Sequence, residues 1–158
     1  MQKTLTAILV VSISLGGFAT PASAGLLSAT GKVIAVLAGE LFVGEAEGHL
    51  SGAGTLSIHS QKRPALTCSG DFTSSSVTKQ GAGKLHCSDG NASTFQFQRL
   101  SVRSGHGTGT LKKGSMSFSY GLSADEARPY LKLPKGKKLV QDGEKLELVD
   151  AAATAPRK

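Results

Sequence analysis

The sequence predicts an all-β fold: an antiparallel meander of hairpins that carry glycine and aromatic residues, forming a small barrel or a compact sandwich. Three observations lead to this prediction. Apolar and polar residues alternate in several segments, as they do in strands with one buried face. The 20 glycines gather in Gly-x-Gly units, and turn-forming pairs such as Asp89-Gly90 separate the alternating segments. We favour the barrel, because closure removes exposed strand edges.

Residues 1–24 have the pattern of a Sec-type signal peptide. Lys3 supplies a short basic region, an apolar run covers residues 5–18, and the small residues Ala22 and Ala24 suit a signal peptidase. The run is shorter than the roughly 20 residues that span a bilayer, and no later segment is long and apolar enough to cross one. We expect cleavage before Gly25, a periplasmic or secreted protein, and no transmembrane segment in the mature chain.

The mature chain is expected to be a single β domain over residues 25–149. The full chain has 18 Lys and Arg against 11 Asp and Glu, a net charge of +7, and loses one positive charge with Lys3. This charge is uneven, with several glutamates early in the chain and a basic stretch, residues 132–138, later. The basic stretch contains Lys132, Lys135, Lys137 and Lys138.

A glycine-rich unit recurs three times along the chain. Gly52-Ala53-Gly54-Thr55-Leu56 is followed by similar units at residues 81–85 and 107–111, and each precedes an alternating segment with aromatic residues. The spacing predicts hairpins over about 50–72, 81–97 and 107–120. No helix pattern follows the glycines, which excludes a phosphate-binding loop.

The turns between the strands predict a register for each hairpin. A three-residue loop at 88–90, with Gly90 left-handed, keeps the apolar side chains of the second hairpin on one face. A two-residue Lys113-Gly114 turn is predicted for the third hairpin and a longer loop for the first. In all three hairpins an aromatic ring then lies across from a strand glycine, and the ring covers backbone that has no side chain to protect it. The expected pairs are Gly52 with Phe72, Gly83 with Phe95, Gly109 with Phe118, and Gly107 with Tyr120.

Cys68 and Cys87 are expected to form a disulfide, since an even cysteine count in an exported chain favours pairing. If the strands that carry them are antiparallel neighbours, one register sets the cysteines directly opposite each other and pairs Phe72 with Gly83. The alternative is a Cys/His metal site, but only His86 adjoins a cysteine and no Cys-x-x-Cys spacing exists. We therefore assign no metal ligand.

The remaining elements lie on either side of these hairpins. Residues 32–43 are apolar and predict one or two buried strands broken near Gly39. Ser123 and Glu126 have capping-box spacing, which predicts a single helical turn near 123–128 that Pro129 limits. Residues 138–149 predict a final hairpin, in which an Asp142-Gly143 turn pairs Leu139 with Leu146. The Ala-rich tail, residues 150–158, is expected to be disordered.

The sequence offers no clear catalytic constellation, and we assign no catalytic residue and no cofactor. It has no Gly-x-Ser-x-Gly motif, and Asp71 and Asp89 adjoin glycines, where a turn explains them. His106 lies between glycines in a segment expected to be a flexible, accessible loop. The alternative function is therefore a small exported hydrolase or ligand-binding enzyme that uses His106 with a nearby Asp or Ser.

The basic stretch suggests a second alternative, a binder of anionic lipid or glycan in the cell envelope. Nucleic acid is not expected as a partner, because strand-based binding needs exposed aromatic residues and most of these are expected to be buried. The Gly-x-Gly-x-Leu units, the Cys-Ser-Asp-Gly turn and the trailing Phe-x-Phe resemble small exported bacterial proteins of undefined role, over residues 48–121. That resemblance implies an exported β-repeat domain and no activity. The leading expectation is a non-enzymatic structural or binding module.

Overall fold

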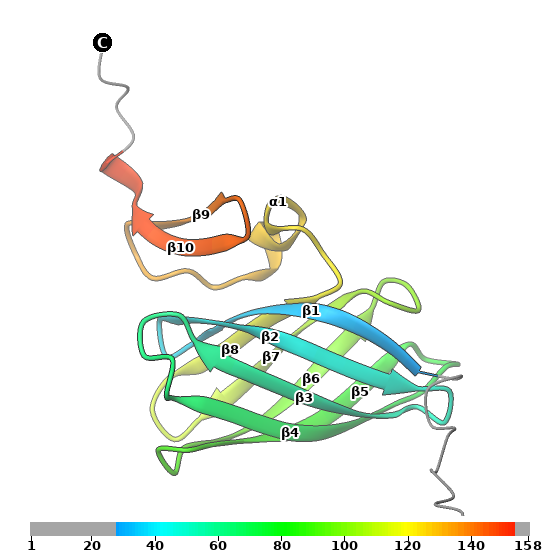
Figure 1. Ribbon diagram of the computed structural model, residues 1–158. Helices are drawn as coiled ribbons and strands as arrows, with labels where there is room; N and C mark the ends of the chain where they lie inside the picture. Colours follow the sequence, from blue (N-terminus) through cyan, green and yellow to red (C-terminus); the bar gives the residue numbers. More distant parts are fainter. Residues whose placement is uncertain (1–27, 154–158) are drawn as a thin grey trace, which may run out of the picture.

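The computed structural model describes residues 28–153, in which eight antiparallel strands close into a barrel (Figure 1). Each strand pairs with the next along the chain, and the first pairs with the eighth. The prediction of an all-β meander is confirmed, and the barrel is the form adopted. The strands are β1 (Ser28–Leu37), β2 (Glu40–His49), β3 (Ala53–Ser60), β4 (Thr67–Ser74), β5 (Gln80–Cys87), β6 (Ala92–Arg99), β7 (Gly105–Leu111) and β8 (Ser115–Tyr120).

Strand alternation separates an apolar barrel interior from a polar outer wall. The outward positions of β3 to β7 are exposed and carry residues such as Thr55, Asp71, Lys84 and Gln96. The inward positions form one continuous core, because their side chains converge on the barrel axis. Its buried members are Val33, Ala35, Leu37, Phe42, Leu56, Ile58, Leu66, Cys68, Leu85, Phe95, Phe97, Met116 and Phe118.

Rings on β4, β6 and β8 lie over glycines on β3, β5 and β7. Phe95 lies opposite Gly83 on one side and opposite Gly109 on the other. A Cβ atom added to Gly83 would overlap the Phe95 ring. The same relation holds between Phe97 and Gly81 and between Phe72 and Gly54. An eight-stranded barrel is narrow, and bare glycines give the rings space inside it.

The second hairpin and the link between β4 and β5 have the predicted registers. Cys68 lies opposite Cys87 and is bonded to it. Phe72 lies opposite Gly83, as expected from that pairing. Gly90 has a φ of +82°, and the Cys87 amide donates to the Asn91 carbonyl across the predicted three-residue loop.

The predicted registers of the first and third hairpins are wrong by two residues. Phe72 lies opposite Gly54 rather than Gly52, because buried Ser60 pairs with Leu66 and thereby sets the register of β3 and β4. In the third hairpin the turn is Lys112-Lys113 instead of Lys113-Gly114, since the Leu111 amide donates to the Gly114 carbonyl. A shift of two residues leaves every side chain on its predicted face. The observed pairs are Gly109 with Met116, Gly107 with Phe118, and Gly105 with Tyr120.

The C-terminal layer, residues 122–153, packs on the outside of β1 and β8 (Figure 1). Ser123 caps α1 (Ala124–Ala127) with the predicted capping box, and η2 (Arg128–Tyr130) follows with Pro129 in its first turn. Two strands, β9 (Lys137–Asp142) and β10 (Lys145–Asp150), form a separate hairpin. Its leucines join outward residues of the barrel in a second core, whose buried members are Ile34, Val36, Leu41, Ala124, Ala127, Leu131 and Leu139.

Two predictions for this layer need correction. Leu139 lies opposite Leu148 rather than Leu146, because Gly143, with a φ of +59°, begins the turn instead of ending it. The tail was expected to be disordered from residue 150, yet Asp150 closes β10 and η3 (Ala151–Ala153) follows it. The predicted signal peptide and the last five residues lie outside the described residues.

Candidate functional site

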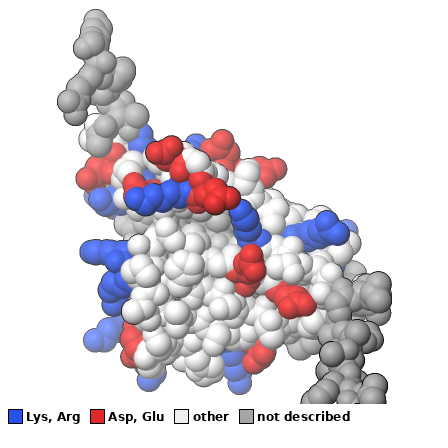
Figure 2. Space-filling view, viewed as in Figure 1, with Lys and Arg blue, Asp and Glu red and all other residues white. Residues whose placement is uncertain are grey.

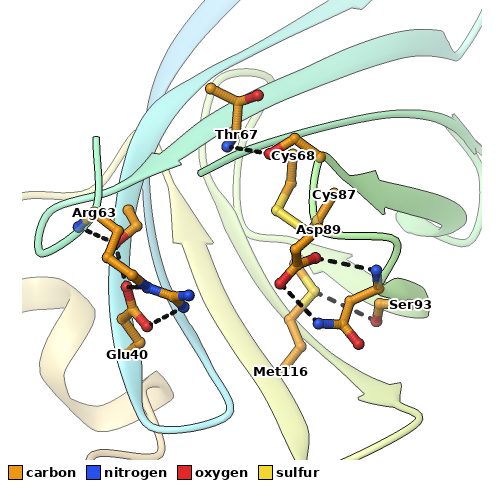
Figure 3. Close-up of a disulfide and its surroundings, with 11 residues drawn as sticks. Glu40, Arg63, Thr67, Cys68, Cys87, Asp89, Ser93 and Met116 are labelled. Carbon is orange, nitrogen blue, oxygen red and sulfur yellow. Dashed lines mark hydrogen bonds and ion pairs between the residues drawn. A yellow bond between two sulfur atoms is a disulfide. The ribbon is translucent and has the colours of Figure 1, made fainter. Parts of the chain in front are cut away.

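The two ends of the barrel differ, and one of them is filled by side chains. At this closed end the Cys68–Cys87 disulfide lies in the interior beside Met116, which is fully buried (Figure 3). Leu66 and Leu85 belong to the same core. A covalent bridge and buried apolar side chains therefore fill the interior at this end of the barrel.

A cluster of hydrogen bonds around the Glu40 carboxylate stabilises the loop beside the closed end. Glu40 accepts hydrogen bonds from Arg63 Nε at 3.1 Å and Nη2 at 2.6 Å, and from the Ser60 hydroxyl (Figure 3). The Ser60 oxygen accepts in turn from the Lys62 and Arg63 amides. The hydrogen bond from the Arg63 guanidinium holds the pKa of Glu40 below its usual value. Because these hydrogen bonds tie Glu40 and Ser60 to the loop, we assign this cluster a structural role.

The opposite end opens into a cavity of about 400 Å³. The start of β1 and three loops, residues 50–52, 75–79 and 100–104, surround its opening. Five aromatic side chains line the cavity, together with the smaller Ala46 and Leu56. The five are Phe72, Phe95, Phe97, Phe118 and Tyr120. We call this cavity the barrel mouth.

The rings of the barrel mouth hold one another in place. Phe97 is in contact with Phe72 and Tyr120, at ring-centroid distances of 5.4 and 6.0 Å and nearly perpendicular planes. Phe95 meets Phe118 in the same edge-to-face manner, at 5.3 Å. This arrangement is favourable for aromatic quadrupoles. The wall of the cavity is therefore formed before any ligand arrives.

Several polar side chains also line the cavity, among them Arg99, Arg103 and Tyr120. Arg99 ends the inward row of β6 and lies opposite Gly105, which lies opposite Tyr120 on its other side. With only a glycine between them, the two side chains are neighbours across the mouth. Burial raises the pKa of Tyr120 to about 12, although the Arg99 charge acts the other way. The Tyr120 hydroxyl therefore remains a hydrogen-bond donor at neutral pH.

Arg99 forms no ion pair with any residue that the structure describes. The residues that line the barrel mouth include no aspartate or glutamate. A half-buried guanidinium beside a hydroxyl donor, in a mainly apolar cavity, is an arrangement that suits an anionic group.

His106 lies in β7 instead of in the predicted loop, and its side chain points to the outer wall. Its ring stacks on Tyr130 of η2, with centroids 3.9 Å apart and planes 11° from parallel. The neighbouring Ser119, opposite it on β8, has a buried hydroxyl without a hydrogen-bond partner among the described residues. No Ser–His pair forms here. A broad polar depression beside His106 includes Gln96, Gln98 and Thr108 but no carboxylate.

The basic stretch of residues 132–138 lies in the C-terminal layer among acidic groups (Figure 2). Lys137 pairs with Asp150 at 2.8 Å, and the Lys132 amide donates to the Ser117 hydroxyl. Lys135 is exposed, and Lys138 is half-buried. The structure thus places these lysines in a layer of mixed charge, and none of them lines the barrel mouth.

The barrel mouth was not predicted from the sequence. The sequence feature that could have indicated it is the alternation of Phe95, Phe97 and Arg99 in β6, where a series of inward apolar side chains ends with a cation. Within residues 28–153, no three His, Cys, Asp or Glu side chains gather as potential metal ligands. No helix in this range has the length and apolar character to cross a membrane. Comparison of the sequence with known protein families, curated proteins and solved structures finds no match.

Proposed function

We propose that this protein is an exported, non-enzymatic binding module that holds a small amphipathic anion in the barrel mouth. The observation that carries the proposal is the aromatic-lined cavity of about 400 Å³, open at one end and lined by Arg99, which has no ion-pair partner among the described residues. Its volume and its mainly apolar lining, with few polar groups, are typical of small-molecule sites.

The chemistry of the lining selects the ligand class. An alkyl or ring system would replace water against the five aromatic side chains, which releases free energy in proportion to the apolar area covered. A carboxylate or similar anion at the mouth would accept from Arg99 and from the Tyr120 hydroxyl. A cationic or zwitterionic head group would bring positive charge beside Arg99 and is disfavoured.

Export is supported by two features of the chain. Residues 1–24 have the composition of a signal peptide, and the cysteines form a disulfide, a bond that persists in oxidising compartments. We place the protein in the periplasm or outside the cell on these grounds.

Calorimetry with three ligands of equal chain length tests the proposal. Dodecanoate should bind more tightly than dodecanol, and dodecylammonium should bind weakest, all below their aggregation concentrations. Arg99→Gln should weaken dodecanoate binding by about tenfold or more, since a hydrogen bond to a charged group contributes roughly 1.5–3 kcal/mol. Binding of dodecanol should change little.

Ala46→Leu is the matched test of the cavity itself. Ala46 is an inward residue that lines the mouth and does not belong to the ring network, so a larger side chain there fills the space. This variant should lose both dodecanoate and dodecanol. If the unmodified protein binds neither ligand, or if Ala46→Leu binds both as well as before, the barrel mouth is not a ligand site.

A further inference from the structure

The exposed large apolar side chains of the described chain are all found around the barrel mouth. Leu50 is 75% exposed, Val77 89%, Leu100 47% and Val102 71%. Each belongs to one of the three loops at the open end, residues 50–52, 75–79 and 100–104. We call these three loops with Arg99 the rim. Exposed leucine and valine side chains are individually ordinary, but their confinement to one end of a barrel marks an interaction surface.

The rim is also cationic. It contains Lys79, Arg99 and Arg103, and no aspartate or glutamate occurs in its loops. Lys79 and Arg103 are exposed. In the C-terminal layer, by contrast, lysines lie among acidic groups, and Lys137 pairs with Asp150. Apolar tips and unopposed cations therefore coincide at the open end.

We propose that the rim docks reversibly on the surface of an anionic lipid bilayer, with the apolar tips in the head-group region and the cations on lipid phosphates. This inference goes beyond the proposed ligand, although Leu50, Arg99, Val102 and Arg103 of the rim also line the barrel mouth. Interfacial binding of this kind needs apolar side chains on one face and Lys or Arg beside them. The polar outer wall of the barrel stays in water in this orientation, and the mouth faces the lipid.

The arrangement of the tips favours a bilayer over a protein partner. The four side chains stand on three separate loops around an opening, instead of forming one flat contiguous patch of the area that a stable protein interface needs. A bilayer surface is deformable and accepts separate tips at different depths. The excess of positive charge complements anionic head groups.

Flotation with lipid vesicles tests the docking. The full mature protein, without added ligand, should float with phosphatidylcholine vesicles that contain phosphatidylglycerol. It should bind pure phosphatidylcholine much less, and high salt should release it, because salt screens exposed charges. Lys79→Asn with Arg103→Gln should weaken binding about 25-fold, at about fivefold per cation. Asparagine suits position 79 because Lys79 has a φ of +57°.

Three further variants make the test specific. Val77→Ser with Val102→Ser should also weaken flotation, with the charge unchanged. Lys112→Gln with Lys113→Gln removes two exposed cations from the closed end and should leave flotation near that of the unmodified protein. Ala46→Leu fills the cavity without touching the rim, so it should lose dodecanoate and still float; failure of docking and failure of ligand binding are thereby separated.

Several results would overturn the inference. These are no flotation of the unmodified protein at low salt, or an equal loss in the rim and closed-end charge variants. A loss in Lys135→Gln with Lys137→Gln but not in the rim variants would assign lipid binding to the basic stretch of the C-terminal layer. Thermal denaturation of every variant confirms that a lost interaction is not a lost fold.

Discussion

At the scale of single residues, the barrel depends on glycines that have different amounts of space beside them. Gly83 and Gly48 are both strand glycines that face inward. A Cβ atom on Gly83 would overlap the Phe95 ring and lie 2.5 Å from the Asp71 carbonyl oxygen. A Cβ atom on Gly48 would meet only the tip of the Phe72 ring, at 3.8 Å, an ordinary contact.

This difference predicts opposite effects for the same substitution. Gly83→Ala should lower the free energy of unfolding by about 1–3 kcal/mol, because the methyl group overpacks a site bounded by a ring and by backbone. Gly48→Ala should be neutral or should stabilise by up to about 1 kcal/mol, through lower entropy of the unfolded chain. Urea denaturation of the two variants measures both. Equal effects at the two positions would mean that the ring does not lie over Gly83.

At the scale of elements, the sequence predicts which faces are buried better than it predicts which residues are paired. The disulfide register could be predicted, because two cysteines on neighbouring strands can bond only when they lie opposite each other. The first, third and C-terminal hairpins each offered a turn one residue away from the real one, which shifts the register by two residues. Both choices bury the same side chains, so the hydrophobic pattern could not distinguish them. The decisive interactions, such as the hydrogen bond from the Ser60 hydroxyl to the Glu40 carboxylate, are tertiary.

The candidate site was missed for a related reason. Arg99 is a charged residue at a strand end, where sequence reasoning expects a solvated side chain. It becomes part of a site only because the pairing of β6 with β7 and of β7 with β8 brings Gly105 and Tyr120 beside it. The loop assignment of His106 was wrong because the glycines around it belong to β7, where they make room for rings from the neighbouring strands.

The disulfide between β4 and β5 gives a testable prediction at the scale of elements. Replacing Cys68 and Cys87 together by alanine should lower the free energy of unfolding by about 3 kcal/mol, chiefly by releasing a loop of the unfolded chain. The reduced, unmodified protein should show the same loss in urea. Reductant should not affect the double variant, which serves as its control. If oxidised and reduced protein unfold at the same urea concentration, the disulfide does not constrain the unfolded chain.

At the scale of the whole molecule, the barrel is polarised along its axis. The closed end has the disulfide and the Glu40–Arg63 cluster, and the C-terminal layer covers one side, where β1 is buried on both faces from Val33 to Leu37. The open end has loops, exposed apolar tips and the cavity. Local stability should follow this polarity, since regions with few buried contacts open more readily. A ligand in the mouth would stabilise the end that is least stable without it.

Hydrogen exchange measured with and without dodecanoate tests this polarity and locates the ligand. Without ligand, amides of β4 and β5 near the disulfide should exchange more slowly than those of the same strands near residues 75–79. Dodecanoate should slow exchange around Arg99 and in the loop 100–104, because binding to the folded state alone makes local opening less favourable. Ala46→Leu should show no such protection. Protection around His106 on the outer wall would instead support the enzyme alternative. Protection confined to residues 132–138 would place the anion on the basic stretch, and either result would contradict a site in the barrel mouth.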